Sequence, residues 1–170
     1  RLVLGHVDVP VPSTFPAQKV QSTQEMADAV GSEIPAADVL VMAAAPADFR
    51  PRQVADRKIK KAGKPASIDL EPTPDILGVT KKQRKKGALI VGFALETDAA
   101  IENGRHKLDA KDLDLIVVNN ALEEGAGFGV DTNRVTFLSR DGQRQDLPLM
   151  SKSDLAEQLL DRIEGMLNGR

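Results

Sequence analysis

The segment from Val39 to Lys61 combines the residue types that could bind a phosphorylated ligand. Its apolar run, Val39 to Met42, is typical of a strand buried on both faces of a parallel sheet. The three alanines that follow, 43 to 45, would let a ligand approach the backbone, and the carboxylate of Asp48 comes next. Ligands of open α/β sheets bind beyond the carboxyl ends of the strands. We therefore expect a ligand site at this end of the strand.

A basic loop comes a few residues further along the chain. Lys58, Lys60 and Lys61 precede Gly63, whose conformational freedom would let the loop move. Ammonium groups pair with phosphate oxygens, and a carboxylate such as Asp48 is a hard ligand for Mg²⁺. The alternative for Asp48 is a structural role as the cap of a turn or helix. Together these residues indicate a phosphorylated ligand that carries a metal ion.

A second group of candidate residues follows the next apolar strand. Lys107 and Lys111 lie four residues apart on a predicted helix, so their ammonium groups project from one face and can converge on one polyanion. An ordinary pair of surface lysines is the alternative. Phe93, beside Gly92 in the strand, could stack on a base or fill the core. His106 is interpreted as a surface residue rather than a general base.

The composition excludes several kinds of chemistry. The chain has no cysteine and two histidines, so thiolate catalysis and cysteine-bound zinc are impossible and a Ser-His-Asp site has few ways to be built. Twenty-three basic residues against 25 acidic ones disfavour general affinity for nucleic acid. Neither GxGxxG nor GxxxxGK[ST] occurs, so lysines and helix N-termini would have to hold any phosphates.

Length and hydropathy suggest one ordinary domain outside the membrane. A chain of 170 residues is long enough to bury a core but short for two full domains. No apolar run approaches the roughly 20 residues of a membrane-spanning helix, and no signal peptide begins the chain. We expect a soluble, cytoplasmic protein without a membrane partner.

Apolar periodicity predicts strands and helices in alternation. Ser22 and Glu25 form a capping box at the start of the first helix, and Arg140, Asp141 and Gly142 form the turn of a hairpin. The Lys-rich stretch 81–86 is interpreted as a solvated helix end. The expected strands are 1–5, 18–21, 39–42, 67–70, 88–94, 113–118, 134–138 and 143–147, and the expected helices are 23–34, 74–86, 98–111 and one from about 151 with an apolar face of Leu155, Leu159, Leu160, Ile163 and Met166.

This alternation predicts an α/β fold, namely a Rossmann-like three-layer sandwich with a mostly parallel sheet and a C-terminal hairpin. A glycine-flanked loop around Phe128 precedes the hairpin and is either an ordinary turn or a lid.

Six motifs in this order resemble the phosphopantothenoylcysteine synthetase domain of the bacterial coenzyme A pathway. Each motif alone is weak, but they are in register over essentially the whole chain. They are AAAPADFRP at 43–51, KIKK at 58–61, PTPDIL at 72–77, VGFALET at 91–97, the lysine pair leading into DLIVVNN at 114–120, and GFGVDTN at 127–133.

The resemblance implies a phosphopantothenate–cysteine ligase that uses CTP and Mg²⁺. In that family the carboxylate of 4'-phosphopantothenate attacks the α-phosphate of CTP and releases pyrophosphate. The amine of cysteine then attacks the acyl-cytidylate to give an amide and CMP. Such a reaction needs charge compensation and alignment more than a protein nucleophile, which suits a chain without cysteine.

The resemblance also implies roles for residues that match the family's motifs. Met42, Ala43 and Ala44 would present their backbone to the nucleotide, and Ala45 would adjoin the acyl intermediate. Asp48 and Phe93 would contact the nucleotide, Phe93 at its cytosine end, and Asn119 would be structural. Lys58 would reach into the site from the basic loop. Binding of the nucleotide would also involve the start of a helix, at Pro74, Asp75, Ile76 and Leu77. Lys107 and Lys111 would hold the triphosphate. No metal ligand is assigned.

The chain departs from the family at its beginning. Family members start with a further strand, a glycine-containing phosphate loop and an Asn-Arg-Ser-Ser-Gly-type segment, and residues 1–170 contain none of these. A sheet without that strand has an exposed hydrogen-bonding edge. The resemblance further implies a homodimer, formed through the hairpin around Asp141, and a flavin-dependent decarboxylase domain fused upstream.

Two other functions remain open on the sequence. A non-catalytic nucleotide-binding fragment would keep CTP affinity without ligase activity. A nucleic-acid-binding module would use the basic runs at Lys58 and Lys81 and would bind oligonucleotides with a steep salt dependence. The slight excess of acidic over basic residues, and the lack of aromatic residues among those lysines, argue against nucleic-acid binding.

Overall fold

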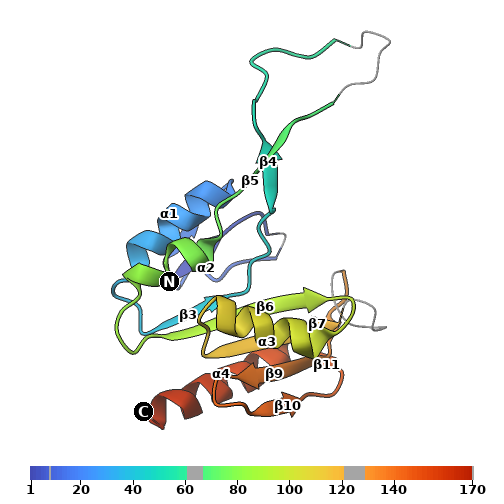
Figure 1. The fold of residues 1–170 in the computed structure, drawn as a ribbon. Helices are drawn as coiled ribbons and strands as arrows, with labels where there is room; N and C mark the ends of the chain where they lie inside the picture. The colour runs from blue at the N-terminus through green and yellow to red at the C-terminus, as the bar shows by residue number, and fades with distance from the viewer. Residues whose placement is uncertain (8, 61–66, 121–128, 170) are drawn as a thin grey trace. The chain divides into compact units, whose positions relative to one another are not determined.

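The computed structural model describes residues 1–7, 9–60, 67–120 and 129–169. Within it the chain forms two compact units (Figure 1). Unit 1 contains Arg1–Glu33 and Ala45–Lys82, and unit 2 contains Ile34–Ala44 and Gln83–Arg170.

Unit 2 is built on a mixed five-stranded sheet with the strand order β10-β9-β7-β6-β3. β3, β6 and β7 are parallel to one another, whereas β9 runs antiparallel to both β7 and β10. The predicted α/β class and C-terminal hairpin are therefore confirmed, and half of the four strand pairs are parallel. The strands are β3 (Val39–Met42), β6 (Leu89–Glu96), β7 (Leu115–Asn120), β9 (Val135–Ser139) and β10 (Arg144–Asp146).

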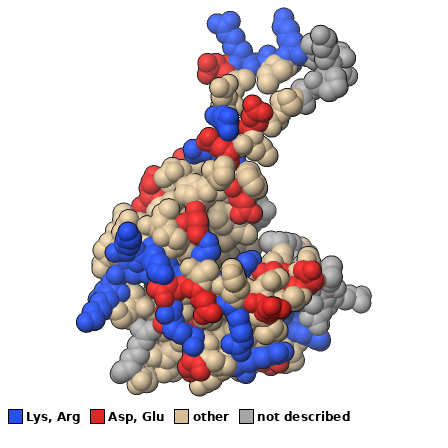
Figure 2. All heavy atoms as spheres, in the orientation of Figure 1, with Lys and Arg blue, Asp and Glu red and all other residues tan. Residues whose placement is uncertain are grey.

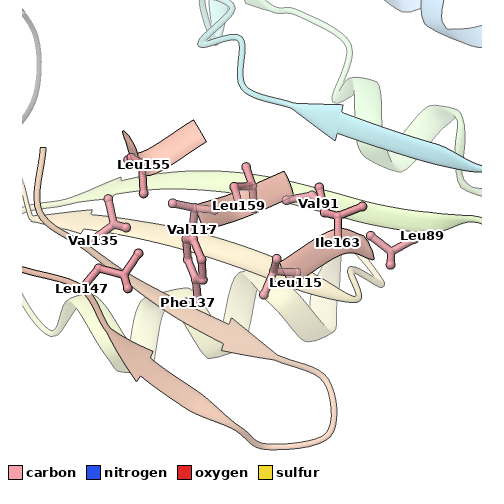
Figure 3. Close-up of a cluster of buried hydrophobic side chains, with 10 residues drawn as sticks. All are labelled: Leu89, Val91, Leu115, Val117, Val135, Phe137, Leu147, Leu155, Leu159 and Ile163. Carbon is pink, nitrogen blue, oxygen red and sulfur yellow. The ribbon is translucent and has the colours of Figure 1, made fainter. Parts of the chain in front are cut away.

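Helices α3 (Ala100–Ala110) and α4 (Lys152–Asn168) pack on opposite faces of this sheet. A methyl group at Gly104 of α3 would meet Val118, whereas Val117 belongs to a buried cluster with Leu159 of α4. Alternate residues of a strand point to opposite faces, so the two helices cover different faces. Figure 3 shows the cluster on the α4 side: Leu89, Val91, Leu115, Val117, Val135, Phe137, Leu147, Leu155, Leu159 and Ile163.

The edge strand β3 differs from the prediction of a strand buried on both faces. Its residues are half-buried, and Val41 is 41% exposed. In the five-stranded sheet β3 pairs with β6 alone, so its other edge lacks a neighbouring strand there. The apolar run indicated a strand correctly, but only the strand order decides whether a strand is central or at an edge.

Unit 1 contains two two-stranded sheets and helix α1 (Thr23–Glu33). β1 (Leu2–Leu4) and β2 (Ala17–Lys19) are parallel. The predicted capping box is present, because Ser22 Oγ accepts a hydrogen bond from Glu25 N at 3.2 Å and Glu25 Oε2 accepts one from Gln21 N at 2.8 Å. The buried apolar residues of this unit are Val20, Met26, Ala27, Ala29, Val30 and Ile76.

A hairpin that the sequence did not predict lies between these elements. β4 (Phe49–Pro51) pairs antiparallel with β5 (Leu70–Pro72), and the two form the base of an extended arm (Figure 1). The strand expected at 67–70 is thus shifted, because Leu70 is the first residue that pairs with β4. Figure 2 shows basic side chains on the described part of the arm.

The helix expected at 74–86 is much shorter. α2 spans Ile76–Val79, and a 3₁₀ turn, η1, covers Lys81–Gln83. Ile76 is 3% exposed, but residues 81 to 86 carry no apolar side chain that could be buried against a core. The hydroxyl of Thr80 also donates to Ile76 O at 2.6 Å, and this bond competes with the backbone hydrogen bonds that would continue the helix.

The predicted C-terminal hairpin and last helix are present, but the sequence predicted neither a further two-stranded sheet nor the exposure of Leu160. The turn of the β9–β10 hairpin contains Gly142 at φ +88°, a conformation that favours glycine. β8 (Thr132–Asn133) pairs with β11 (Met150–Ser151), and Ser151 caps α4 by accepting from Asp154 N. Leu160 is 62% exposed and does not belong to the buried face of α4. In the described part of the chain, every helix is too short or too polar to cross a membrane.

Candidate active site

The carboxyl end of β3 pairs with the middle of β6, and several of the predicted residues of unit 2 lie at or near this point. Met42 is in register with Gly92 on the neighbouring strand, so Phe93 lies one residue beyond the level of Met42. Met42 is half-buried, and Ala43 and Ala44 are exposed. The exposed residues just after β3 therefore lie beside Phe93 of β6.

Phe93 does not fill the core. Its side chain is 38% exposed, although its neighbours along β6 are buried. A partly exposed aromatic ring can stack on a planar ligand, which was one of the two interpretations that the sequence allowed.

Lys107 and Lys111 lie at the end of α3 as predicted. Lys107 is in the last turn and Lys111 is the C-cap residue. The Lys107 side chain is 47% exposed, and its Nζ lies 2.6 Å from Glu96 Oε1 at the end of β6. Lys107 thus contacts the end of the strand that carries Phe93, but residues 93 and 96 point to opposite faces of the sheet.

In unit 1 the hairpin places Asp48 beside the start of α2. Thr73 N donates to Asp48 O at 2.9 Å, and Thr73 Oγ1 donates to Ala47 O at 2.5 Å. Pro74 and Asp75 follow directly. The backbone of Asp48 makes this connection, and its carboxylate is on an exposed residue, so the carboxylate is accessible to a ligand.

The four predicted residues at α2 differ in accessibility. Asp75 is the N-cap residue and makes no side-chain capping bond. Ile76 is 3% exposed, so contact between its side chain and a ligand would require it to leave the core. Pro74 and Leu77 are half-buried, and thus any contact here would involve the backbone of the first turn.

Lys58 and Ala45 are exposed residues of unit 1. Lys58 lies in the β4–β5 arm, beyond the paired residues that end at Pro51. It is therefore not packed against Asp48 or α2 in the way that Thr73 is. The rest of the basic loop, from Lys61 to Lys64, and Phe128 lie outside the described residues.

The predicted residues are thus distributed over both units. Unit 2 holds Met42, Ala43, Ala44, Phe93, Lys107 and Lys111, and unit 1 holds Ala45, Asp48, Lys58, Pro74, Asp75, Ile76 and Leu77.

Two polar residues near the strand ends of unit 2 have no predicted ligand-binding role. Glu96 has a side chain that is only 11% exposed and contacts Lys107. Asn119, for which only a structural role was inferred, has a buried Oδ1 that accepts no hydrogen bond from the residues that the structure describes. For Glu96 the sequence did offer a signal, because this glutamate lies three residues after Phe93 and just before the helix that carries Lys107.

Neither a cluster of metal ligands nor a cavity identifies the candidate site in the described part of the chain. Among the residues that the structure describes, no three His, Cys, Asp or Glu side chains are grouped as a metal site. A hollow of about 280 Å³ in unit 1 lies between β2 and α1. None of the predicted residues lines it, so it does not mark the candidate site.

Comparison with known proteins assigns the family. Residues 1–167 match the family described as the DNA/pantothenate metabolism flavoprotein C-terminal domain. The chain is 44% identical over 147 residues to the coenzyme A biosynthesis bifunctional protein CoaBC of Bacillus subtilis (strain 168), a match that covers 86% of this chain and 36% of that protein. The chain therefore spans about a third of the length of this relative.

Solved structures agree with this assignment. The crystal structure of the C-terminal domain of a CoaBC protein aligns with a TM-score of 0.80 at 32% identity, covering 99% of this chain and 74% of that one. A Cab2 variant in complex with phosphopantothenate-cysteine aligns with a TM-score of 0.66 at 18% identity, covering 90% and 54%, and shows a similar fold. The chain belongs to the DNA/pantothenate metabolism flavoprotein C-terminal domain family.

Proposed function

We propose that this chain is the nucleotide-binding part of a phosphopantothenate–cysteine ligase that acts in coenzyme A biosynthesis and uses CTP. The observation that carries the proposal is the exposed backbone after Met42 beside the partly exposed ring of Phe93, together with the accessible ammonium of Lys107 at the end of β6. The relationship to a bifunctional coenzyme A biosynthesis protein, of which the chain spans about a third, supports it.

The reaction joins a carboxylate to an amine in two steps. An oxygen of the 4'-phosphopantothenate carboxylate attacks the α-phosphorus of CTP, the bond to the β-phosphate oxygen breaks, and pyrophosphate leaves. The amine of cysteine then attacks the acyl carbon, CMP leaves, and the nitrogen loses a proton. The first step develops negative charge on phosphate oxygens, so cations held at fixed positions lower its barrier.

Within this proposal the residues of unit 2 bind the nucleotide. Backbone groups of Met42, Ala43 and Ala44 contact it, Phe93 stacks at its cytosine end, and Lys107 and Lys111 hold the triphosphate. Each lysine supplies a charge-assisted hydrogen bond, which is roughly twice as strong as a neutral one.

The residues of unit 1 complete the proposed set. The carboxylate of Asp48 contacts the nucleotide, and the first turn of α2, at Pro74 to Leu77, contributes backbone. Ala45 adjoins the acyl intermediate. Lys58 in the arm provides a cation for the transfer step.

Mg²⁺ is proposed to bind together with the triphosphate. Mg²⁺ keeps several water ligands and is commonly held by substrate phosphates with one or two carboxylates, so a dedicated protein cage is not required. When bound, the ion neutralises phosphate charge. The exposed Asp48 carboxylate is a suitable oxygen donor, and this chemistry fits the absence of a three-residue metal cluster in the described ranges.

The wider architecture is also part of the proposal. We propose a Rossmann-like three-layer arrangement, a homodimer formed through the hairpin around Asp141, a cytoplasmic location, and a longer protein in which a flavin-dependent decarboxylase domain precedes residue 1. Support comes from the relationship to the bifunctional CoaBC protein, of which this chain matches 36%.

Calorimetric titration with CTP and then ATP, in the presence of Mg²⁺, tests the nucleotide. We expect CTP to bind more tightly. A coupled assay of pyrophosphate release in the presence of 4'-phosphopantothenate tests the first chemical step. Affinity for CTP without phosphopantothenate-dependent release would favour a non-catalytic nucleotide-binding role, and failure to bind either nucleotide would refute the proposal.

A further inference from the structure

The carboxylate of Glu96 is held almost out of water at the end of β6. Its side chain is 11% exposed, and Oε1 has less than 1 Å² of accessible surface. Both oxygens have polar neighbours on α3. Asn103 Nδ2 donates to Oε2 at 3.2 Å, and Lys107 Nζ lies 2.6 Å from Oε1. A carboxylate this far from solvent requires such neighbours, because burying an unpaired charge is costly.

Asn103 is fixed by a second contact. Its Nδ2 also donates to Asp98 O at 3.0 Å, just before α3 begins. The amide therefore ties the Glu96 carboxylate to the loop between β6 and α3. Glu96 is consequently a rigid anchor at this point, rather than a mobile surface side chain.

The contact with Lys107 leaves the ammonium group available to a ligand. The 2.6 Å separation of Lys107 Nζ and Glu96 Oε1 is that of a charge-assisted contact. An ammonium group has three N–H donors, so donors remain for a ligand when one faces Oε1. Nearly half of the Lys107 side chain is exposed, so a ligand can reach it.

A lysine side chain carries about 2 kcal/mol of rotamer entropy, much of which is lost when a ligand fixes it. An anchor that already restricts the side chain reduces this loss and so increases affinity. The opposing effect is repulsion between the carboxylate and a polyanion. Glu96 has little exposed surface and lies beside a cation, so we expect the gain from restricting Lys107 to exceed this repulsion.

We propose that Glu96, oriented by Asn103, is a positioning residue that holds the Lys107 ammonium at the carboxyl end of β6 for the phosphate oxygens of a nucleoside triphosphate. This inference rests on the proposed function, because it assigns Lys107 to the triphosphate. Glu96 itself does not contact the ligand. It acts through Lys107 alone.

The test measures binding of inorganic tripolyphosphate, and separately of CTP with Mg²⁺, to the full chain by calorimetry. Glu96→Ala and Glu96→Gln are compared with Glu102→Ala, which removes an exposed carboxylate from the first turn of the same helix. We expect Glu96→Ala to weaken tripolyphosphate binding about fivefold or more, as for loss of preorganisation. Glu96→Gln should retain part of the affinity, because its amide oxygen can still accept from the lysine. Glu102→Ala should bind like the parent chain.

A double-mutant cycle separates positioning from a general structural effect. In a Lys107→Ala background, Glu96→Ala should cause no further loss of affinity, because the group that it positions is gone. An equal loss in both backgrounds would overturn the proposal, as would tighter tripolyphosphate binding by Glu96→Ala or Glu96→Gln. Normal binding by both Glu96 variants would also refute it, while leaving the proposed function intact. If the parent chain bound neither CTP nor tripolyphosphate, the proposed function would fail and this inference with it.

Discussion

The ammonium groups of Lys107 and Lys111 are the groups on which nucleotide affinity is proposed to depend. Replacing either by alanine should weaken CTP binding by about 1 to 3 kcal/mol, the loss expected for one charge-assisted contact. Titration calorimetry measures this change. Lys82→Ala, on the exposed η1 turn, is the control and should bind like the parent chain. Unchanged affinity in both variants would remove the assigned role of the lysine pair.

Lys58 is proposed to serve the chemical step rather than binding. It is exposed in the arm and is not packed against the residues around Asp48. Lys58→Ala should lower kcat by about 10- to 100-fold, because one source of charge compensation is lost in the transition state, and should change CTP affinity little. Steady-state kinetics alongside calorimetry separates the two quantities. A loss confined to affinity would contradict this role.

At the scale of elements, helix α3 approaches the sheet closely through Gly104. A Cβ added there would lie 2.5 Å from Val118 Cγ2 and 3.1 Å from Leu138 Cδ1. Gly104→Ala should therefore destabilise the protein by about 1 to 2 kcal/mol, because overpacking outweighs the gain in helix propensity. Urea unfolding measures the change.

Gly165 in α4 is the matched control for that substitution. Among the described residues, no atom outside the adjacent backbone of α4 lies within 4 Å of a Cβ added at Gly165. Gly165→Ala should stabilise the protein by about 0.5 to 1 kcal/mol, because alanine loses less backbone entropy in a helix. Equal effects of the two substitutions would show that the close approach of α3 to β7 is not the cause.

The β9–β10 hairpin contains a carboxylate whose pKa is lowered. The hydroxyl of Thr136 donates to Asp146 Oδ1 at 2.6 Å, and this bond, followed by the contacts with Arg144, lowers the pKa of Asp146 below its ordinary value. A lowered pKa in the folded state adds stability above the unfolded-state pKa, and this contribution is lost as the pH falls below about 4.

Asp146→Asn should accordingly flatten the fall in stability below about pH 4, because the replaced group no longer binds a proton on unfolding. Thermal unfolding at several pH values measures this effect. Asp161→Asn, at an exposed position of α4, is the control. The effect should be small, since the Asp146 side chain is 59% exposed. A pH profile identical to that of the parent chain would contradict the expectation.

At the scale of the whole molecule, the two units differ in how much apolar surface they bury. Unit 2 has a five-stranded sheet with fully buried residues such as Leu115, Val117 and Leu138, whereas unit 1 has two-stranded sheets and few buried side chains. Local opening is easiest where buried contacts are few. We therefore expect the slowest amide hydrogen exchange in β6, β7 and β9, and faster exchange in β1, β2, β4 and β5. Uniform protection across both units would contradict this expectation.

The sequence predicts an element of the fold well when the signal for it lies within the element's own residues. The capping box at Ser22, the glycine turn at Gly142 and the buried run of β6 are local signals, and each corresponds to the observed element. The β4–β5 hairpin and the short α2 were missed. Their bounds depend on which strand Leu70 pairs with and on whether residues after Thr80 meet a core.

The candidate site shows the same division. The amino-acid sequence by itself determined the chemical types available at the predicted site, namely lysines, two aspartates and the ring of Phe93, with no cysteine. It also determined the motifs that indicate the family. Only the tertiary structure decided that Phe93 is partly exposed, that β3 is an edge strand, and that Glu96 holds Lys107. The physical reason is that residue types and local periodicity are properties of the chain, whereas exposure and partners depend on which distant segments pack together.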